Sequence, residues 1–392
     1  MRVLHVGKFH PPFAGGMENF IADLLPALEA QGVCSAVLVH DEGRAGGHSP
    51  DASRIYRARS YGRVLYAPVS PSFPFRLHRA IRDFRPDLLH LHLPNTSAFW
   101  AMSVPSARAL PWVVHWHADV VTRGGDPRLD RAYRLYRPFE QALLARSHLI
   151  IATSPPYLEA SRALAPWQAR CRVIPLGLDA GRLADPDPAM REDADRRWGK
   201  GVFRVLAVGR LARYKGFDRL IEAAAALPGC RILIVGAGDQ EPRLSARLQE
   251  LGLGARVELM GFRSDAEMHG LLATCDVLCL PSLERAEAFG LVLLEAMRFA
   301  KPVVASDIPG SGVGWVVREA GHGLTTAPGD AERLAAALRA LQLDPGRRRQ
   351  LGDAGAAALR IRFGIASTAR AIAELYRLPE LEAASPAEIG GR

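Results

Sequence analysis

Val205–Leu220, "VLAVGRLARYKGFDRL", holds one complete strand–loop–helix unit. Its first residues are apolar and rich in Val, which predicts a strand over Arg204–Gly209 that is buried on both faces. A basic loop follows, and from Phe217 the apolar residues recur at the helical period. A buried strand that leads through a loop into a helix is the building block of parallel α/β sheets.

The same unit recurs along the whole chain. Expected strands before it are Arg2–Gly7, Ser35–His40, Arg63–Pro68, Leu88–Leu93, Trp112–His117, His148–Thr153 and Cys171–Leu176. Expected strands after it are Arg231–Gly236, Arg256–Gly261, Val277–Pro281 and Pro302–Ser306. Expected helices are Met17–Gly32, which Pro26 should kink or end early, Ile365–Leu378, and helices from Phe217, Glu241, the capping box Ser264/Glu267 and Asp330. The predicted fold class is α/β, with two Rossmann-like doubly wound domains that face a cleft.

A polar, charge-rich segment separates the two halves. It carries several prolines and no apolar period, so we expect a linker over 181–201 between domains 1–180 and 202–363. Residues 364–378 should form a final helix, and 379–392 a polar tail.

The composition is that of an ordinary globular protein. The chain has 392 residues, of which 48% are hydrophobic and 23% charged. Its start, "MRVLHVGKFHPPF", lacks the apolar core of a signal peptide, and its five cysteines are dispersed, so we expect reduced thiols in the cytoplasm. No apolar run approaches 18 residues. The net charge of +9 predicts an anionic partner.

Two glutamates interrupt an otherwise apolar run in "RAEAFGLVLLEAM", residues 285–297. Glu287 and Glu295 stand eight residues apart, and a buried carboxylate is costly unless something pairs with it. If a helix begins near Gly290, Glu295 lies about 7 Å further along its axis.

The start of that helix would form an anion site. The first free N–H groups belong to Leu291 and Val292, and they favour negative charge. The spacing to Glu295 matches the separation between a nucleotide's phosphate and its ribose. The alternative is that Glu295 pairs with a buried arginine and Glu287 is solvated.

Further candidate ligand residues follow other strands. Arg210 and Lys215, after the strand that ends at Gly209, suit a diphosphate, although such charges are often only solvated. Gly15 and Gly16 precede the first helix and would let a phosphate approach its backbone.

The paired histidines and the paired aspartates are candidate metal ligands. His90 and His92 share one strand face, as do His115 and His117, but no carboxylate or Cys stands at ligand spacing beside them. We therefore expect satisfied strand histidines and no metal site, with His117 placed to reach a ligand. The D-x-D triplets at 185–187 and 193–195 lie among like charges in the expected linker and are not read as a metal site.

Together these elements resemble the GT-B glycosyltransferases of family 4, which are retaining enzymes that use nucleotide sugars. The family's E-x7-E element matches Glu287 and Glu295, and its Arg–Lys pair matches Arg210 and Lys215. Its Gly-Gly loop matches Gly15 and Gly16, and its histidine matches His117. "VIPLGLD", from Val173, resembles the family's segment that closes the first domain, with Leu176 where Asn is usual. The similarity runs from Met1 to about Leu378.

The resemblance implies a role for each matched residue. Glu295 would hold the ribose, Glu287 the sugar hydroxyls, and His117 the sugar. Arg210 and Lys215, with the amides of the next helix, would hold the diphosphate and stabilise its departure without a metal or other cofactor. Phe289 and Gly290 would complete the donor site, and the base would be read largely by backbone near Gly261, Phe262 and Arg263.

Residues 52–85 carry the strongest local charge. Eight arginines and six aromatics stand with one acid, Asp83, which suits either docking on an anionic membrane or a solvated basic face. The first reading implies a lipid-linked or polysaccharide-precursor acceptor at the cytoplasmic face of the inner membrane. A nucleic-acid-binding protein is the alternative from another class, but no nucleic-acid-binding motif is present.

"HLHLPN" (His90–Asn95) and "AEAFGLVLLEAM" resemble mannosyltransferases of surface-polysaccharide assembly, so the expected donor is GDP-mannose. The alternatives are transfer from a UDP-sugar, and an enzyme that epimerises or hydrolyses a nucleotide sugar.

Overall fold

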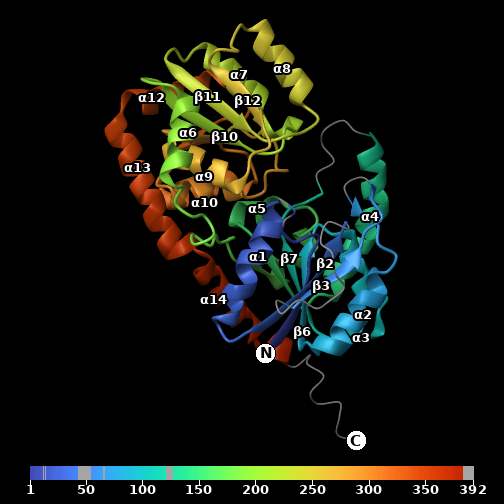
Figure 1. The fold of residues 1–392 in the computed structure, drawn as a ribbon. Coiled ribbons are helices and arrows are strands. Elements are labelled where there is room, and N and C mark those ends of the chain that lie inside the picture. The colour runs from blue at the N-terminus through green and yellow to red at the C-terminus, as the bar shows by residue number, and fades with distance from the viewer. Residues whose placement is uncertain (12, 14, 43–53, 65–66, 121–126, 383–392) are drawn as a thin grey trace, which may run out of the picture. The chain divides into compact units, whose positions relative to one another are not determined.

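The computed structural model describes residues 1–11, 13, 15–42, 54–64, 67–120 and 127–382. They form two compact units. One consists of Met1–Gly177 with Ile365–Arg392, and the other of Leu178–Gly364. Each unit is built on a parallel sheet with helices packed on it (Figure 1).

The sheet of the first unit has seven parallel strands. In spatial order they are β3 (Ile55–Arg59), β2 (Cys34–Asp41), β1 (Arg2–Val6), β6 (Leu88–Leu93), β7 (Trp112–Trp116), β8 (Leu149–Ala152) and β9 (Cys171–Val173). Every residue of β6 and β7 is buried, as their apolar sequences predict. The strand order reverses between β1 and β6, which is where doubly wound sheets bind ligands.

The expected strand Arg63–Pro68 is not part of this sheet, so that prediction is wrong. Its described residues form a separate antiparallel pair, β4 (Arg63–Val64) and β5 (Ala67–Pro68), while 65–66 lie outside the described residues. Both residues of β4 are exposed, and Pro68 has no N–H to give to a ladder. The edge of the sheet is formed instead by β3, which the sequence analysis missed.

Helices cover the strands of the first unit. They are α1 (Gly16–Glu29), α2 (Phe73–Phe84), α3 (Pro105–Arg108), α4 (Pro127–Arg146), α5 (Pro155–Ala160), α14 (Ile365–Tyr376) and α15 (Pro379–Glu382), with 3-10 turns η1 (Thr96–Met102) and η2 (Ala165–Arg170). Pro26 lies inside α1, which ends at Glu29, three residues before the expected Gly32.

The last long helix, α14, packs against α1 although the two are more than 300 residues apart (Figure 1). Its Thr368 hydroxyl donates to the carbonyl of Pro175 at 3.0 Å, and Arg377 donates to the carbonyl of Gln31 at 3.3 Å. Residues 383–392, most of the expected polar tail 379–392, lie outside the described residues.

The second unit has six parallel strands. In spatial order they are β12 (Val257–Gly261), β11 (Cys230–Val235), β10 (Phe203–Val208), β13 (Val277–Leu280), β14 (Val303–Ser306) and β15 (Gly323–Thr326). The order reverses between β10 and β13. The sequence analysis predicts all of these strands except β15, of whose four residues only Thr326 is buried.

The helices of this unit are α6 (Pro188–Trp198), α7 (Phe217–Ala225), α8 (Glu241–Glu250), α9 (Asp265–Thr274), α10 (Leu291–Arg298), α11 (Gly312–Ala320), α12 (Ala331–Leu343) and α13 (Pro345–Ala358), with a 3-10 turn η3 (Arg213–Lys215) and a π turn η4 (Leu359–Phe363). Of these, α7, α8, α9, α10 and α12 begin where the sequence signals place them, whereas the sequence analysis did not predict α6, α11 and α13. Ser264 and Glu267 form the expected capping box of α9, and Asp330 caps α12.

Residues 181–201, where the sequence predicts a linker, instead include α6 and belong to the second unit. Asp187 caps this helix, and α6 packs against α9. Trp198 is buried and donates from its indole nitrogen to the Thr274 hydroxyl at 2.9 Å. The polar composition hides the helix because only Ala194 and Trp198 are buried.

Candidate donor-binding site

The candidate site lies at the carboxyl edge of the second sheet. The loop after β10 carries Arg210 and Lys215, and the loop after β13 carries Glu287. Because β10 and β13 are neighbours at the point where the strand order reverses, these two loops meet. In doubly wound sheets this is the position that binds nucleotides.

A glycine brings the two loops into contact. Gly216 has a φ of +67°, and a side-chain carbon added there would lie 2.1 Å from the carbonyl oxygen of Pro281. Beside it, the Leu283 N–H donates to the carbonyl of Tyr214 at 2.7 Å. Only glycine permits this approach, which places Lys215 against the loop after β13.

Lys215 and Glu287 form an ion pair at the centre of the site. The Lys215 Nζ lies 2.6 Å from Glu287 Oε2, and the two side chains are only 11% and 12% exposed. Ser282 also donates from its hydroxyl to Glu287 Oε2, at 3.0 Å. Burial opposes the charge on Lys215, but Glu287 and Tyr214 together outweigh it, so the pKa of Lys215 is raised. Lys215 is therefore cationic at neutral pH.

A second cation lies on the same loop. Arg210 is exposed, and its guanidinium carbon is 5.8 Å from the centroid of the Tyr214 ring. The Lys215 Nζ is 5.7 Å from that centroid. The ring of Tyr214 thus holds both cations near one position at the edge of the sheet.

The helix after Glu287 begins as the sequence predicts. Gly290 caps α10 with a φ of +79°, and a side-chain carbon there would lie 2.9 Å from Leu280 Cδ2. The N–H groups of Leu291 and Val292 open the first turn, where a helix favours an anion. Glu295 is partly buried one turn further along.

The loop that carries Glu287 is also attached to the next strand–helix connection. The Ser311 hydroxyl donates to the carbonyl of Glu287 at 2.5 Å and accepts from the Val313 N–H at 3.2 Å. The Arg285 Nε donates to the carbonyl of Gly310 at 2.8 Å. These bonds limit the freedom of the Glu287 backbone.

The sequence analysis missed three residues of this arrangement: Tyr214, Ser282 and Ser311. Tyr214 stands directly before Lys215, and Ser282 follows the strand β13 by two residues. Their positions after expected strands were a usable signal, since carboxyl-end loops of parallel strands share one edge.

Four other expected donor residues lie around the same unit. Gly261 ends β12, Phe262 is 70% exposed, and Arg263 lies 3.7 Å from Glu267. Phe289 has a buried side chain that packs on Phe363 with ring centroids 6.4 Å apart. Phe289 can therefore offer a ligand only its backbone.

Gly15 and Gly16 start α1 in the first unit, as expected. A side-chain carbon added at Gly15 would lie 2.1 Å from Glu18 Oε2, so the Glu18 carboxylate covers this helix end. Burial raises the pKa of Glu18, although its own backbone N–H stabilises the charged form. A phosphate at this position would have to displace that side chain.

His117, also in the first unit, directly follows β7 and is buried among other histidines. Its Nε2 lies 2.9 Å from the Nδ1 of His92, and its ring stacks on that of His115 at 4.3 Å. Burial lowers the pKa of His117 to about 3, so the ring is neutral at physiological pH.

The aspartates of the two D-x-D triplets contact protein groups. Asp187 caps α6, and Asp185 lies 3.4 Å from Arg298. Asp193 pairs with Arg196 and Arg197, and Asp195 with Arg204. These contacts give each carboxylate a structural partner.

Comparisons with known proteins identify relatives of both halves. Residues 190–358 match the family described as glycosyl transferases group 1, and residues 15–177 match a glycosyl transferase 4-like domain. O-antigen chain mannosyltransferase C of Escherichia coli is 30% identical over 348 residues, which are 87% of this chain and 88% of that protein. D-rhamnosyltransferase WbpZ of Pseudomonas aeruginosa is 29% identical over 90% of this chain and 89% of its own.

Solved structures agree with these matches. Sucrose-phosphate synthase of Thermosynechococcus elongatus superimposes with a TM-score of 0.78 at 25% identity, over 98% of this chain and 100% of the other. The predicted GT-B fold class is thereby confirmed. Within the described residues, no helix is both long and apolar enough to cross a membrane.

Proposed function

The chain belongs to the glycosyl transferases group 1 family and is a glycosyltransferase, and we propose that it is a retaining enzyme that moves mannose from GDP-mannose. The proposed acceptor is a lipid-linked or polysaccharide-precursor glycan of the cell surface. The observation that carries the proposal is the buried Lys215–Glu287 pair beside the start of α10.

In this proposal the diphosphate binds between the loop after β10 and the start of α10. Arg210, Lys215 and the amides of Leu291 and Val292 surround it with positive charge. Glu295 accepts hydrogen bonds from the ribose hydroxyls. The bases of different nucleotides are read by backbone near Gly261.

Glu287 has two tasks in the same site. Its Oε2 holds Lys215 and Ser282, which fixes the ammonium, and its Oε1 accepts hydrogen bonds from hydroxyls of the donor sugar. The two oxygens of one carboxylate thus serve the protein's own cation and the donor sugar.

The transfer step needs no nucleophile from the protein. The bond between the sugar C1 and the phosphate oxygen breaks, and the acceptor oxygen forms a bond to C1 on the same face. The acceptor proton passes to the departing phosphate oxygen. Positive charge at Arg210 and Lys215 stabilises the diphosphate as it leaves, so the proposed step is independent of a metal.

The name of one relative supports mannose as the transferred sugar. This relative is named a mannosyltransferase, and its similarity covers 87% of this chain. Purified protein would be given GDP-mannose or a UDP-sugar in EDTA, with and without a lipid-linked glycan acceptor. We expect GDP release that depends on acceptor, together with a mannosylated product.

Four other results would contradict parts of this proposal. If the enzyme turns over a UDP-sugar and not GDP-mannose, the donor is the UDP-sugar of the alternative. Equal release without acceptor would indicate a hydrolase, and a converted nucleotide sugar an epimerase. Turnover only with added magnesium would contradict the metal-independent step.

We also propose that the first unit binds the anionic cytoplasmic face of the inner membrane. Residues 52–85 contribute exposed Tyr61 and Phe75, the latter 77% exposed. Phe73 and Phe84 belong to the core instead, Tyr66 lies outside the described residues, and Arg54 and Arg63 pair with acids. The charge of this stretch is thus partly neutralised.

Helix α4 adds a second surface of the same character, which the sequence analysis missed. Leu135 is 72% and Phe139 56% exposed, one turn apart, and Arg131 and Arg134 are exposed beside them. Apolar side chains flanked by arginines on one helix suit an anionic bilayer surface.

Vesicle co-sedimentation tests the membrane proposal. Binding to anionic vesicles should fall with salt, and Phe139→Asp should weaken it. The matched control is Leu343→Asp, which changes an exposed apolar residue of the second unit. Failure to bind anionic vesicles at low salt, or equal effects of the two substitutions, would reject this surface.

A further inference from the structure

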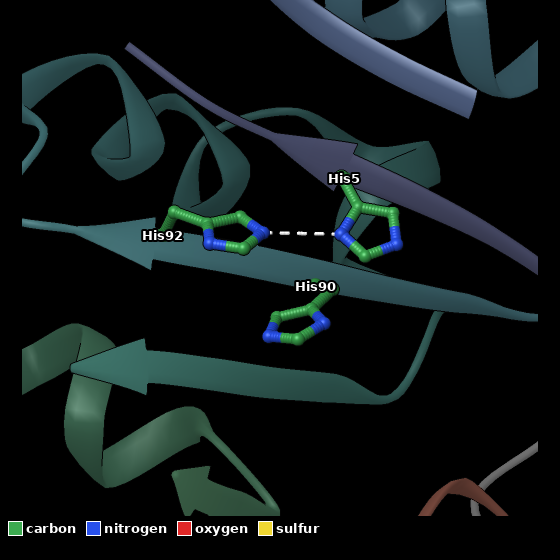
Figure 2. Close-up of side chains that lie close together, drawn as sticks. All are labelled: His5, His90 and His92. Atoms are coloured by element: carbon green, nitrogen blue, oxygen red, sulfur yellow. Dashed lines mark hydrogen bonds between the residues drawn. The ribbon is translucent and has the colours of Figure 1, made fainter. Parts of the chain in front are cut away.

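Three buried histidines of the first unit lie together on neighbouring strands. His5 comes from β1, and His90 and His92 come from β6, where His5 and His90 are paired in register. Figure 2 shows the three rings gathered at these strands. None of the three side chains is exposed to solvent.

Part of this cluster is unsatisfied. Among the described residues, His5 Nε2 and His90 Nε2 are buried and have no hydrogen-bond partner. An unsatisfied buried nitrogen destabilises the folded chain, because it has lost its hydrogen bond to water and gained no other. A ligand at His90 Nε2 would satisfy one of these two nitrogens.

We propose that His5, His90 and His92 bind one first-row transition-metal ion that takes imidazole ligands, such as Zn²⁺. One nitrogen from each ring lies within 4.8 Å of the others. The closest pair, His5 Nδ1 and His92 Nε2, is 3.0 Å apart. Ligands of a tetrahedral zinc at its usual bond length are about 3.3 Å apart. The His5–His92 pair is already near this spacing, and the nitrogen of His90 would have to move closer to that pair.

The outer nitrogens of two of these rings are held as ligand histidines require. The Tyr376 hydroxyl lies 2.5 Å from His90 Nδ1, which leaves His90 Nε2 for the ion. His117 Nε2 lies 2.9 Å from His92 Nδ1, which leaves His92 Nε2. Such outer partners fix the tautomer and orientation of metal ligands.

The imidazoles are also in the form that binds metals. Burial lowers the pKa of His5 to about 3 and lowers those of His90 and His92 well below the ordinary value. All three rings are therefore neutral at physiological pH. Metal binding would replace the hydrogen bond between His5 Nδ1 and His92 Nε2. The proton of that bond would move to the other nitrogen of the ring that carries it.

The three proposed metal ligands lie in the first unit, and none of them belongs to the proposed donor site. His117, the outer partner of His92, is the one residue of this cluster that the family resemblance assigns to the donor sugar. The sequence alone offers two histidine pairs, and the parallel register of β1 and β6 adds His5 as the third ligand.

The test uses the full chain without an affinity tag, freed of metal by a chelator. Zn²⁺ binding would be measured by calorimetry, and Co²⁺ would be added as a spectroscopic probe. We expect one ion per chain, retained through desalting, and the visible absorption of tetrahedral Co²⁺. The wild type should also gain thermal stability from Zn²⁺.

Two variants and one control locate the site. His90→Gln should abolish stoichiometric binding, and Tyr376→Phe should weaken it by about 10–100-fold, as loss of an outer partner does. His322→Gln is the matched control, because His322 is another fully buried histidine, in the second unit, with both ring nitrogens unpartnered among the described residues. This control should bind as the wild type does.

Clear results would overturn the proposal. If the metal-free wild type binds no Zn²⁺ or Co²⁺, the cluster is a set of neutral histidines joined by hydrogen bonds. If His90→Gln and Tyr376→Phe, both checked as folded by circular dichroism, bind as the wild type does, the ion lies elsewhere.

Discussion

Lys215 keeps its charge in a nearly buried position because its ammonium lies against the Glu287 carboxylate, which also accepts a hydrogen bond from Ser282. An ion pair of this kind adds little to stability by itself, since removing two charges from water offsets most of the attraction. A functional role explains its position better. The ammonium is held ready for a second anion, which we propose is the donor diphosphate.

Replacing this ammonium tests that role. Lys215→Ala or Arg210→Ala should lower kcat/KM by about 100-fold or more, as the loss of a group that stabilises transition-state charge does. Arg213→Ala, which removes an exposed cation from the same loop, is the control and should have little effect. A loss of less than about threefold for Lys215→Ala would return this pair to a structural role.

Glu295 is expected to bind the ribose. Glu295→Gln should weaken GDP binding by about 1–2 kcal/mol, because it removes hydrogen bonds to a charged acceptor. Calorimetry measures this directly, with Glu332→Gln on the exposed face of α12 as a control. Unchanged affinity would support the alternative that Glu295 has only a structural partner.

Glu140 in α4 is predicted to make stability depend on pH. Burial raises its pKa to about 7, although the Tyr133 hydroxyl, 3.1 Å from Oε2, opposes the shift. The folded chain then holds this proton more tightly than the unfolded chain. The contribution of protonated Glu140 to the stability of the fold is complete below the ordinary pKa of 4.5 and is lost as the pH rises through 7.

Glu140→Gln removes this titration while it keeps the size of the side chain. The free energy of unfolding of the variant should rise relative to that of the wild type as the pH increases from 4.5 to 7. Above pH 7 the difference should reach about 3 kcal/mol. Thermal unfolding at several pH values measures the difference, with the exposed Glu159→Gln as control. A difference that does not change with pH would contradict the raised pKa.

At the scale of elements, a single glycine joins the two loops of the donor site. Gly216→Ala should destabilise the second unit and weaken GDP binding, because the new methyl meets the Pro281 carbonyl and separates Lys215 from Glu287. Gly252→Ala is a matched control, since its φ of +64° is nearly the same but nothing lies within 4 Å.

The two substitutions share the backbone strain of a left-handed residue, which is about 1–2 kcal/mol. Only the difference between them reports the contact of the loops. Equal losses of stability with unchanged GDP affinity in both would show that the close approach is not needed.

Local signals predicted most elements but not all of them. Caps such as Ser264 and Asp330 act through neighbouring atoms, so they are readable from the sequence. The sequence analysis did not predict α6, because most of its residues are polar and its packing depends on the contact of Trp198 with Thr274. Arg63–Pro68 reads as a strand by composition, but pairing in a sheet is decided by distant neighbours.

For the whole molecule, the sequence predicts two Rossmann-like units because apolar strands and helices alternate in both halves. It also places Arg210, Lys215 and Glu287 in loops after strands. It does not predict that Lys215 and Glu287 touch, because β10 and β13 are neighbours in space and not in sequence. The sequence analysis also noted His90 and His92 but not His5, because His5 lies far from them along the chain.

The central claim is that the Lys215–Glu287 site binds a nucleoside diphosphate without a metal, and thermal unfolding in EDTA tests it most directly. GDP at about 100 times its Kd should stabilise the wild type by about 2.7 kcal/mol and raise its Tm by a few degrees. Lys215→Ala should lose this rise. No rise with GDP, UDP, ADP or dTDP, or an equal rise in Lys215→Ala, would contradict the account.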